Sequence, residues 1–398
     1  MEHSRLSSLL WVVAAVISVA LLLFNIAGLW PFIEFVFVSL LSIICWLKYF
    51  HKPLPEQNAA LPFYILSIAL FIILNAIRFA SGYASFIQSN YPGFFKQGMA
   101  LDYTAWFIIL VCFPASVMLF GAYSLAKRTT AGFFFGCWAF FYNIAESLLQ
   151  FKVELGSIST YKHEYFLAVF AAMVLFLLSA YGIMRLIKPN GEMIAANTEL
   201  ALPTKRKVNL WSALFVTLVI IYGVTLCTQA GILPVGVIAG SMMGGMIGWR
   251  KTTAMAPADP YKLVPLYLLL QALFYVHVGE ETITHFNRGI AAITGHSWSD
   301  KEFNYFIAFL GPVIWVFAAW SLWKRQAFGN FILWFMIVGM ILGEPTHVLV
   351  FPVVRMFKQG VGYEYFSGMY TALFPMVPAI IALVVIIKDH KAQKAHHA

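Results

Sequence analysis

Four ionisable side chains stand inside one hydrophobic stretch of this sequence. They are His277, Glu280, Glu281 and His285. Such side chains are costly within an apolar transmembrane helix, and by default they mark a functional site. On a helix with about 3.6 residues per turn, all four fall on one broad face. That face predicts either a metal site or acid–base chemistry.

A second pair of such residues, Glu344 and His347, lies on a later apolar run with the spacing Glu-x-x-His. Residues three apart share a helix face, and helical-bundle di-metal proteins project this pair inward as ligands. Pro345 between them cannot donate a backbone hydrogen bond, so we expect a kink there. Broken helices at membrane depth are tolerated where they line a cavity or pack on protein.

Two mechanisms follow from these residue types. In the first, they bind a divalent metal, iron, zinc or manganese, that activates water or oxygen. The candidate ligands are His277, Glu280, Glu281, His285, Glu344 and His347. In the second, no metal is bound, and a buried carboxylate takes a proton while a histidine donates one. The candidate catalytic residues are His277, Glu280, Glu281 and His347. The adjacent carboxylates of Glu280 and Glu281 favour the metal, because both stay ionised in low dielectric only beside a cation.

The composition predicts an all-α protein that crosses a membrane many times. The chain has 398 residues, of which 61% are hydrophobic and 11% are charged, and its mean hydropathy is +0.80. Continuous apolar runs of about twenty residues are typical of transmembrane helices and exclude a β-barrel. The net charge of +9 lies in short segments that flank these runs, so we expect the lipid bilayer and no nucleic acid as a partner. The four cysteines lie within apolar runs and predict no disulfide framework.

We expect about twelve transmembrane helices, each near the length that a bilayer requires. Their approximate ranges are 8–28, 31–49, 61–83, 103–126, 131–151, 164–187, 210–231, 234–249, 262–286, 303–323, 329–351 and 364–387. The segment 189–208 carries prolines and a basic run and is the expected cytoplasmic linker. It separates a first six-helix repeat, 1–188, from a second, 209–398.

Short matches in the same order on both sides of this linker indicate a tandem duplication. Gly121–Arg128 matches Ala318–Arg325, and His163–Phe166 matches Tyr363–Phe366. An even number of spans gives two parallel halves, related by an axis along the membrane normal. Most of the 26 Lys and Arg residues fall on the cytoplasmic side if the N-terminus is inside, which predicts that both termini are cytoplasmic. The ionisable residues of the second repeat then converge near the extracytoplasmic side.

The first repeat lacks most of the ionisable set. Small residues, Ser81, Ala84 and Ser85, stand where the second repeat has its first histidine and two glutamates. We therefore expect a degenerate first copy and an active second one. In the first copy Arg78 is expected to have a structural role, either extending its charged end to the membrane interface or pairing with a carboxylate such as Glu146.

The run His277-Val278-Gly279-Glu280-Glu281 resembles the signature of the HXXEE family of bacterial integral membrane proteins. That family resembles a unit of about six spans with a further histidine and a Tyr-x-Pro-Gly motif near its end. By this resemblance His347 is the further histidine, and Tyr365 and Gly368 belong to the last motif, in which Ser367 stands where proline is usual. The resemblance implies substrate-facing or supporting roles for Tyr365 and Gly368, and a bacterial inner-membrane location. It implies no particular reaction.

The leading hypothesis is an intramembrane enzyme that acts on a lipid-like or other hydrophobic small molecule. The alternative is a proton-coupled secondary transporter, since two parallel halves of about six helices match major-facilitator carriers and His–Glu sets can relay protons. Carriers, however, usually build their site from both halves, whereas these ionisable residues lie in the second half only. A structural or assembly subunit is the third class, and it leaves the buried ionisable groups unexplained.

Overall fold

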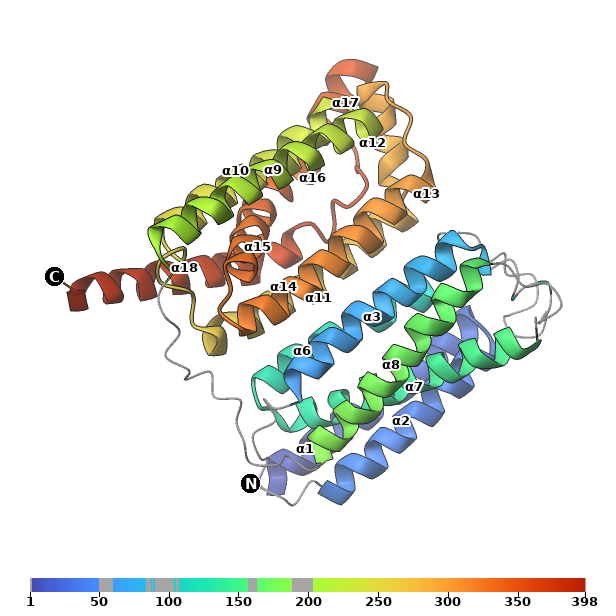
Figure 1. Cartoon of the computed structure of the whole chain (residues 1–398). Coiled ribbons are helices and arrows are strands. Elements are labelled where there is room, and N and C mark those ends of the chain that lie inside the picture. The colour runs from blue at the N-terminus through green and yellow to red at the C-terminus, as the bar shows by residue number, and fades with distance from the viewer. Residues whose placement is uncertain are drawn as a thin grey trace. The chain divides into compact units, whose positions relative to one another are not determined.

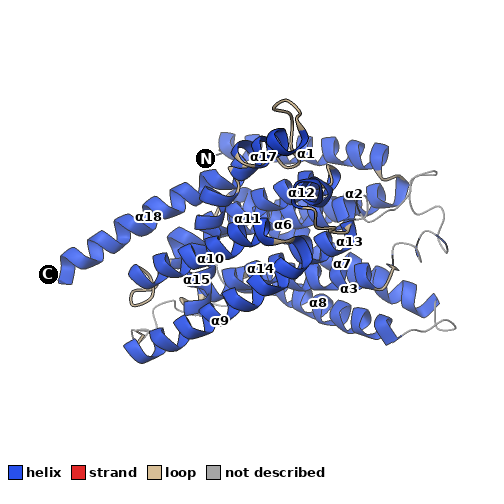
Figure 2. Ribbon diagram, turned by 90° about the horizontal axis from the view of Figure 1, so that it is seen from above, coloured by secondary structure: helices blue, strands red, loops and turns tan. Residues whose placement is uncertain are grey.

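The computed structural model describes residues 2–49, 60–83, 87, 89, 104, 107–156, 163–187 and 203–397. Within these ranges the regular structure is helical, and no strand occurs (Figures 1 and 2). Most of the expected linker 189–208, and the positions Ala84 and Ser85, lie outside the described residues.

Ten segments of the described chain are long and apolar enough to cross a membrane. They are Leu29–Tyr49, Leu61–Ala80, Ile108–Ala126, Phe166–Ile187, Lys205–Gln229, Ile232–Lys251, Pro260–Ile283, Asp300–Trp323, Ala327–Gln359 and Leu373–Ala392. The two other expected spans are also helical. In the first, the apolar stretch whose side chains the structure describes is Leu9–Asn25, and the second carries Asn143 and Glu146, which lower its hydropathy. The architecture is that of a polytopic helical membrane protein.

The chain divides into two compact units, Met1–Ile194 and Ala195–Ala398. The described helices of unit 1 are α1 (Glu2–Ile26), α2 (Leu29–Tyr49), α3 (Leu61–Ala80), the π-helical turn η2 (Ile108–Cys112), α6 (Phe113–Ala126), α7 (Thr130–Gly156) and α8 (His163–Ile187). Helix α7 packs against α2, α6 and α8, and so forms the middle of the unit. Its Trp138 is buried and contacts Phe35 of α2 at a ring distance of 6.0 Å.

Unit 2 carries the predicted site. Its elements are α9 (Lys205–Ala230), α10 (Ile232–Lys251), α11 (Pro260–Ile283), α12 (Phe286–Thr294), α13 (Asp300–Phe303), η4 (Asn304–Leu310), α14 (Gly311–Trp323), α15 (Ala327–Val338), η5 (Gly339–Gly343), α16 (Thr346–Leu349), α17 (Phe351–Gln359) and α18 (Leu373–His397). Helix α11 packs against α14 and α18, while α10 packs against α9 and α15 (Figure 1).

The most deeply buried long helix of unit 2 is α11. It begins where Asp259 accepts a hydrogen bond from the Tyr261 backbone N–H at 3.0 Å, with Pro260 in the first turn. Two phenolic hydroxyls then anchor it to its neighbours: Tyr267 donates to the Trp315 carbonyl at 2.9 Å, and Tyr275 to the Ala308 carbonyl at 3.1 Å. These buried contacts hold the helix in one rotation, and therefore aim its last two turns in one direction.

The segment that follows α15 is broken, as Pro345 predicts. The helix passes through the π-helical turn η5, in which the Glu344 N–H bonds to the Gly339 carbonyl at 3.2 Å. It resumes as the short α16 after Pro345. A π-turn inserts an extra residue and so rotates the side chains that follow it, which is why such turns occur often at functional sites. Here it presents Glu344 and His347 to α11.

Candidate metal centre

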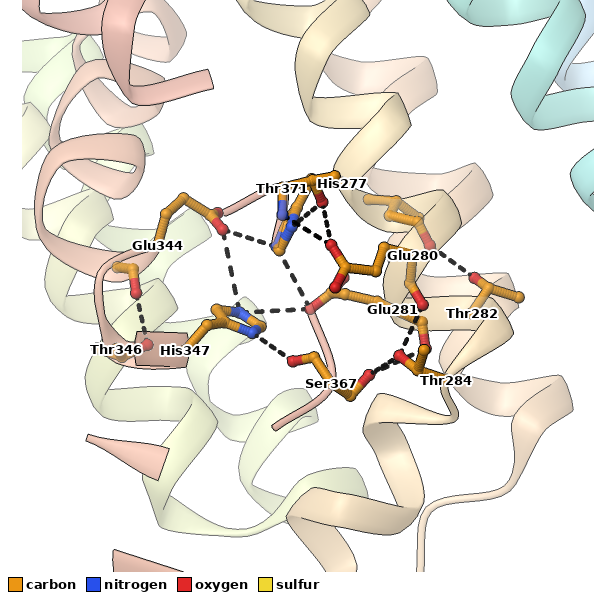
Figure 3. Close-up of polar contacts among 12 residues, drawn as sticks. His277, Glu280, Glu281, Thr282, Thr284, Glu344, Thr346, His347, Ser367 and Thr371 are labelled. Atoms are coloured by element: carbon orange, nitrogen blue, oxygen red, sulfur yellow. Dashed lines mark hydrogen bonds and ion pairs between the residues drawn. The ribbon is translucent and has the colours of Figure 1, made fainter. Parts of the chain in front are cut away.

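Four of the predicted side chains meet within unit 2 (Figure 3). His277 and Glu281 come from α11, where a spacing of four residues places them on one face. Glu344 directly follows η5, and His347 lies in the short helix α16. All four are buried, with exposed fractions of 1%, 5%, 8% and 5% in chain order.

The ligand atoms lie close enough for small side-chain movements to bring them onto a single metal ion. His347 Nε2 lies 3.5 Å from Glu281 Oε1, and His277 Nε2 lies 3.7 Å from the same oxygen. Donor atoms around a tetrahedral ion, with bonds of about 2.0–2.1 Å, lie about 3.3–3.4 Å apart. The ligand atoms of His277, Glu281 and His347 all lie within 4.8 Å of one another. These three residues therefore form a two-histidine, one-carboxylate set.

Glu344 is the fourth member of the cluster. Its Oε2 lies 2.8 Å from His277 Nε2 and 3.9 Å from His347 Nε2. Although His277 Nε2 and Glu344 Oε2 are this close, the angles between them are not those of a hydrogen bond, and neither atom has another hydrogen-bond partner among the described residues. A buried polar atom without a partner costs about 1–3 kcal/mol. A cation bound by His277 Nε2 beside the Glu344 carboxylate would remove this cost, so the residues present fit a metal.

The tautomer of His347 is set by the hydrogen bond of Nδ1, the ring nitrogen that faces away from the cluster. Nδ1 lies 2.8 Å from the Ser367 carbonyl oxygen, which can only accept. Nδ1 therefore carries the hydrogen, and the neutral ring presents the lone pair of Nε2 to the cluster. Metal-binding histidines commonly donate their second N–H to a carbonyl or carboxylate in this way.

The outer nitrogen of His277 is held through a hydroxyl. Thr371 donates its hydroxyl hydrogen to Glu280 Oε2, so its oxygen accepts from His277 Nδ1 at 3.1 Å. This carboxylate–hydroxyl–imidazole chain selects the same tautomer as in His347. Both Nε2 lone pairs then face the Glu281 carboxylate, as two ligands of one ion require.

Glu280 faces away from the cluster and binds the segment before α18. Besides the Thr371 hydroxyl, its carboxylate accepts the Tyr365 hydroxyl at 2.6 Å and the backbone N–H groups of Tyr370 and Thr371 at 3.1 and 2.7 Å. Burial, together with this hydrogen bond to the carboxylate, raises the pKa of Tyr365 to about 12. Tyr365 therefore stays a hydrogen-bond donor at neutral pH.

Gly368 lets the backbone pass directly over both imidazoles. Its φ is +84°, and a Cβ placed there would lie 2.6 Å from His347 Nδ1 and 2.8 Å from His277 Cε1. Any other residue would meet both the conformational cost of this φ and the two rings. The segment 365–371 thus closes the cluster on one side.

His285, like Glu280, is a candidate ligand that the structure places away from the centre, and neither prediction holds. It follows the end of α11 in the left-handed conformation, with φ of 55°. Its Nδ1 lies 3.5 Å from Asp300 Oδ1, and Asp300 also accepts from Arg288 at 2.6 Å. The reversal of the chain after Ile283 turns this side chain off the face that carries His277 and Glu281.

An apolar cavity of about 110 Å³ lies beside the cluster. One ordered water needs only about 10–15 Å³ of such volume, so there is room for water and for part of a substrate. The ring of Phe286 lies 4.8 Å from that of His347, and the ring of Phe351 lies 5.2 Å from it. Further apolar lining comes from Phe274, Trp315, Phe335, Met336 and Met340. The surroundings suit an apolar molecule.

Two polar residues of this site, Thr371 and Ser367, were not predicted from the sequence. Ser367 uses its carbonyl on His347, and its hydroxyl contacts that of Thr284. The available signal was their position next to the Tyr365–Gly368 motif, just before an apolar run. Hydropathy alone does not show which residues of a connecting segment contact a neighbouring helix.

The function of the centre has to be inferred from its geometry, because known proteins offer no guide. No protein-family model, no curated protein and no solved structure matches this chain.

Proposed function

We propose that the protein is an intramembrane enzyme whose centre in unit 2 binds one divalent transition-metal ion and acts on a lipid-like or other apolar substrate. The supporting observation is the buried set His277, Glu281 and His347, with all ligand atoms within 4.8 Å. Iron, zinc and manganese are the candidate ions. Two histidines with one carboxylate favour non-haem iron, which such a set binds with open positions.

The chain's own groups have distinct roles in this proposal. His277, Glu281 and His347 would hold the ion, and the bound ion would supply activation of water or oxygen. Glu344 lies within 2.8 Å of His277 and is placed to hold or move a proton at Oε2. Aromatic side chains around the cavity would bind the apolar part of the substrate and exclude water.

A metal-free enzyme is the second candidate, favoured by one distance. The 2.8 Å between His277 Nε2 and Glu344 Oε2 is shorter than the spacing of about 3.3–3.4 Å expected for two ligands of a tetrahedral ion. It brings an imidazole and a carboxylate close enough to exchange a proton once either group rotates into line with the other. In that version His277 and Glu344 form the acid–base pair, and Glu281 stabilises the charged imidazole.

The family and the topology are also proposals. We assign the chain to the HXXEE family on its motif residues alone, as a tandem duplication with a degenerate first copy. We place the centre near the extracytoplasmic face of a bacterial inner membrane, with both termini in the cytoplasm. The supporting observation is the distribution of Lys and Arg along the sequence.

Metal content of purified protein tests the proposed function. We expect about one iron, zinc or manganese ion per chain, as a single set of three protein ligands implies. His347→Ala should lose this ion. His285→Gln is the matched control and should retain it, because His285 pairs with Asp300 outside the cluster. A wild-type protein that binds none of the three ions, even after their addition, would leave only the metal-free version.

A second experiment separates enzyme from transporter. Enzyme activity on membrane lipids, or the host phenotype, should be lost in His277→Gln and Glu281→Gln. Uptake of a labelled solute into proteoliposomes that depends on a pH gradient would instead support the transporter. If neither variant changes activity or phenotype, the site is not catalytic.

A further inference from the structure

Unit 1 contains a second buried group of ionisable and polar side chains, outside the His–Glu centre. Arg78 of α3 and Glu146 of α7 form an ion pair, as expected from the sequence, and each is 2% exposed. Gln150 and Asn143 share a face of α7 with Glu146 and are fully buried. Glu34 of α2 completes the group through its electrostatic interaction with Glu146 and Arg78.

Each nitrogen of the Arg78 guanidinium donates to a partner other than Glu34. Its Nε donates to Gln150 Oε1 at 2.8 Å, and Nη2 donates to the Glu146 carbonyl at 3.1 Å. Nη1 donates to the Glu146 carboxylate and to Asn75 at 3.4 Å. Arg78 therefore neutralises Glu146 directly, and within the described chain Glu34 forms no ion pair.

The group formed by Glu34, Arg78 and Glu146 has one negative charge more than it has positive charges. Two carboxylates face one guanidinium, and the other titratable groups that the structure describes around Glu34 add no positive charge. Helix α7 contributes Tyr142, and α1 has no titratable side chain between Leu9 and Asn25. An unpaired charge in a low-dielectric bundle costs several kcal/mol. The group must therefore acquire a cation.

Buried atoms without a hydrogen-bond partner indicate where a cation could bind. Glu34 Oε1 is buried and has no hydrogen-bond partner in the described structure. Both amide atoms of Asn143 are likewise buried without a partner, one helical turn before Glu146. Buried amides and carboxylates are normally satisfied, so these atoms indicate an additional ligand.

We propose that Glu34 and Glu146 together hold one exchangeable monovalent cation, a proton or Na⁺, beside Asn143. A proton would bond to one Glu34 oxygen and let the resulting hydroxyl donate to a neighbouring acceptor. Na⁺ would take the carboxylate oxygen and the Asn143 carbonyl oxygen as hard ligands. This site lies within unit 1 and does not depend on the proposed function of unit 2.

Infrared spectra and thermal unfolding of the full chain in lipid nanodiscs test this site. If a proton is bound, the wild type at neutral pH has a protonated-carboxyl band that both Glu34→Gln and Glu146→Gln lack, because each leaves one carboxylate for one guanidinium. If Na⁺ is bound, replacing choline by Na⁺ raises the midpoint of wild-type unfolding by several degrees and leaves both variants unchanged. Glu364→Gln is the control, since Glu364 is an exposed carboxylate.

Either result supports the proposal and identifies the cation. The proposal is overturned if the variants remove no carboxyl band and Na⁺ does not stabilise the wild type. It is also overturned if Glu364→Gln has the same effect as Glu34→Gln. Should the glutamine variants not fold, the wild type alone decides: a spectrum without any protonated carboxyl, together with a sodium-independent midpoint, excludes the site.

Discussion

Glu280 and Glu281 are neighbours in the chain and have different partners. Glu281 faces the two histidines, whereas Glu280 accepts four hydrogen bonds from residues 365–371. Consecutive helical residues point about 100° apart, so a cluster on one side of α11 can take only one of them. Glu281 is thus the candidate ligand, and Glu280 is a positioning residue that acts on His277 through Thr371.

Thr371→Val removes the hydroxyl that joins Glu280 to His277 and keeps the side-chain shape. We expect the affinity for the metal to fall by about 10–100-fold, the usual effect of losing an outer contact to a ligand histidine. Thr371→Ser retains the hydroxyl and should bind as the wild type does. Competition with a chelator measures both variants. Equal affinities of the Val and Ser variants would contradict the positioning role.

Gly368→Ala tests the close approach of the backbone to the imidazoles. The added Cβ would meet both rings, so we expect a lower unfolding midpoint and loss of the bound metal. Gly360→Ala is the matched control, because Gly360 also has a positive φ, +68°, but nothing lies within 4 Å of its Cβ position. It should show only the backbone cost of about 1 kcal/mol. If the two variants unfold alike and retain metal, the clash is not important.

Much of the cluster could be predicted from residue types and spacing alone. His277, Glu281, Glu344 and His347 are costly in lipid, and their i, i+4 and i, i+3 spacings pair them on helix faces. The choice between Glu280 and Glu281 could not be predicted, because it depends on the rotation of α11. His285 illustrates a different limit: its left-handed backbone turns the side chain away, and periodicity assumes that the helix continues.

At the scale of elements, the site depends on a broken helix meeting a continuous one. The π-turn η5 and Pro345 rotate Glu344 and His347 toward α11, while the hydroxyls of Tyr267 and Tyr275 hold α11 in its rotation. The proline predicted the break. The π-turn before it, which packs against α10 and α18, has no comparable signal in the sequence.

The contribution of the ion pair between α3 and α7 to the free energy of unfolding can be measured. Arg78→Met leaves the Glu146 carboxylate buried and uncompensated, which should destabilise the fold by about 3–5 kcal/mol. The double variant Arg78→Met with Glu146→Leu removes both charges and should recover most of this loss. Reversible unfolding in mixed micelles measures the difference. Additive losses in the double variant would mean that the two side chains do not stabilise each other.

At the scale of the molecule, hydropathy predicted a polytopic helical protein, and the helices confirm it. Ten of the expected spans are long and apolar enough to cross a membrane. Hydropathy places residues along the membrane normal and does not say which helices touch. The contacts of α11 with α14 and α18, which surround the site, therefore had to come from the structure.

The topology can be tested directly with fusions at the C-terminus. With most Lys and Arg on the cytoplasmic side, a fluorescent protein that folds only in the cytoplasm should be bright there. An alkaline phosphatase fused at the same position should be inactive. The opposite pattern would place the polar ends of α11 and α16 on the cytoplasmic side and would reverse the proposed orientation.

The central claim is that His277 and His347 bind the same ion. X-ray absorption at the edge of the bound metal measures this most directly. The account predicts scattering from two imidazoles and a carboxylate in the wild type, and from fewer imidazoles in any residual metal of His347→Ala. His285→Gln should give the wild-type spectrum. A bound metal without imidazole scattering, or with a spectrum that His347→Ala leaves unchanged, would contradict it.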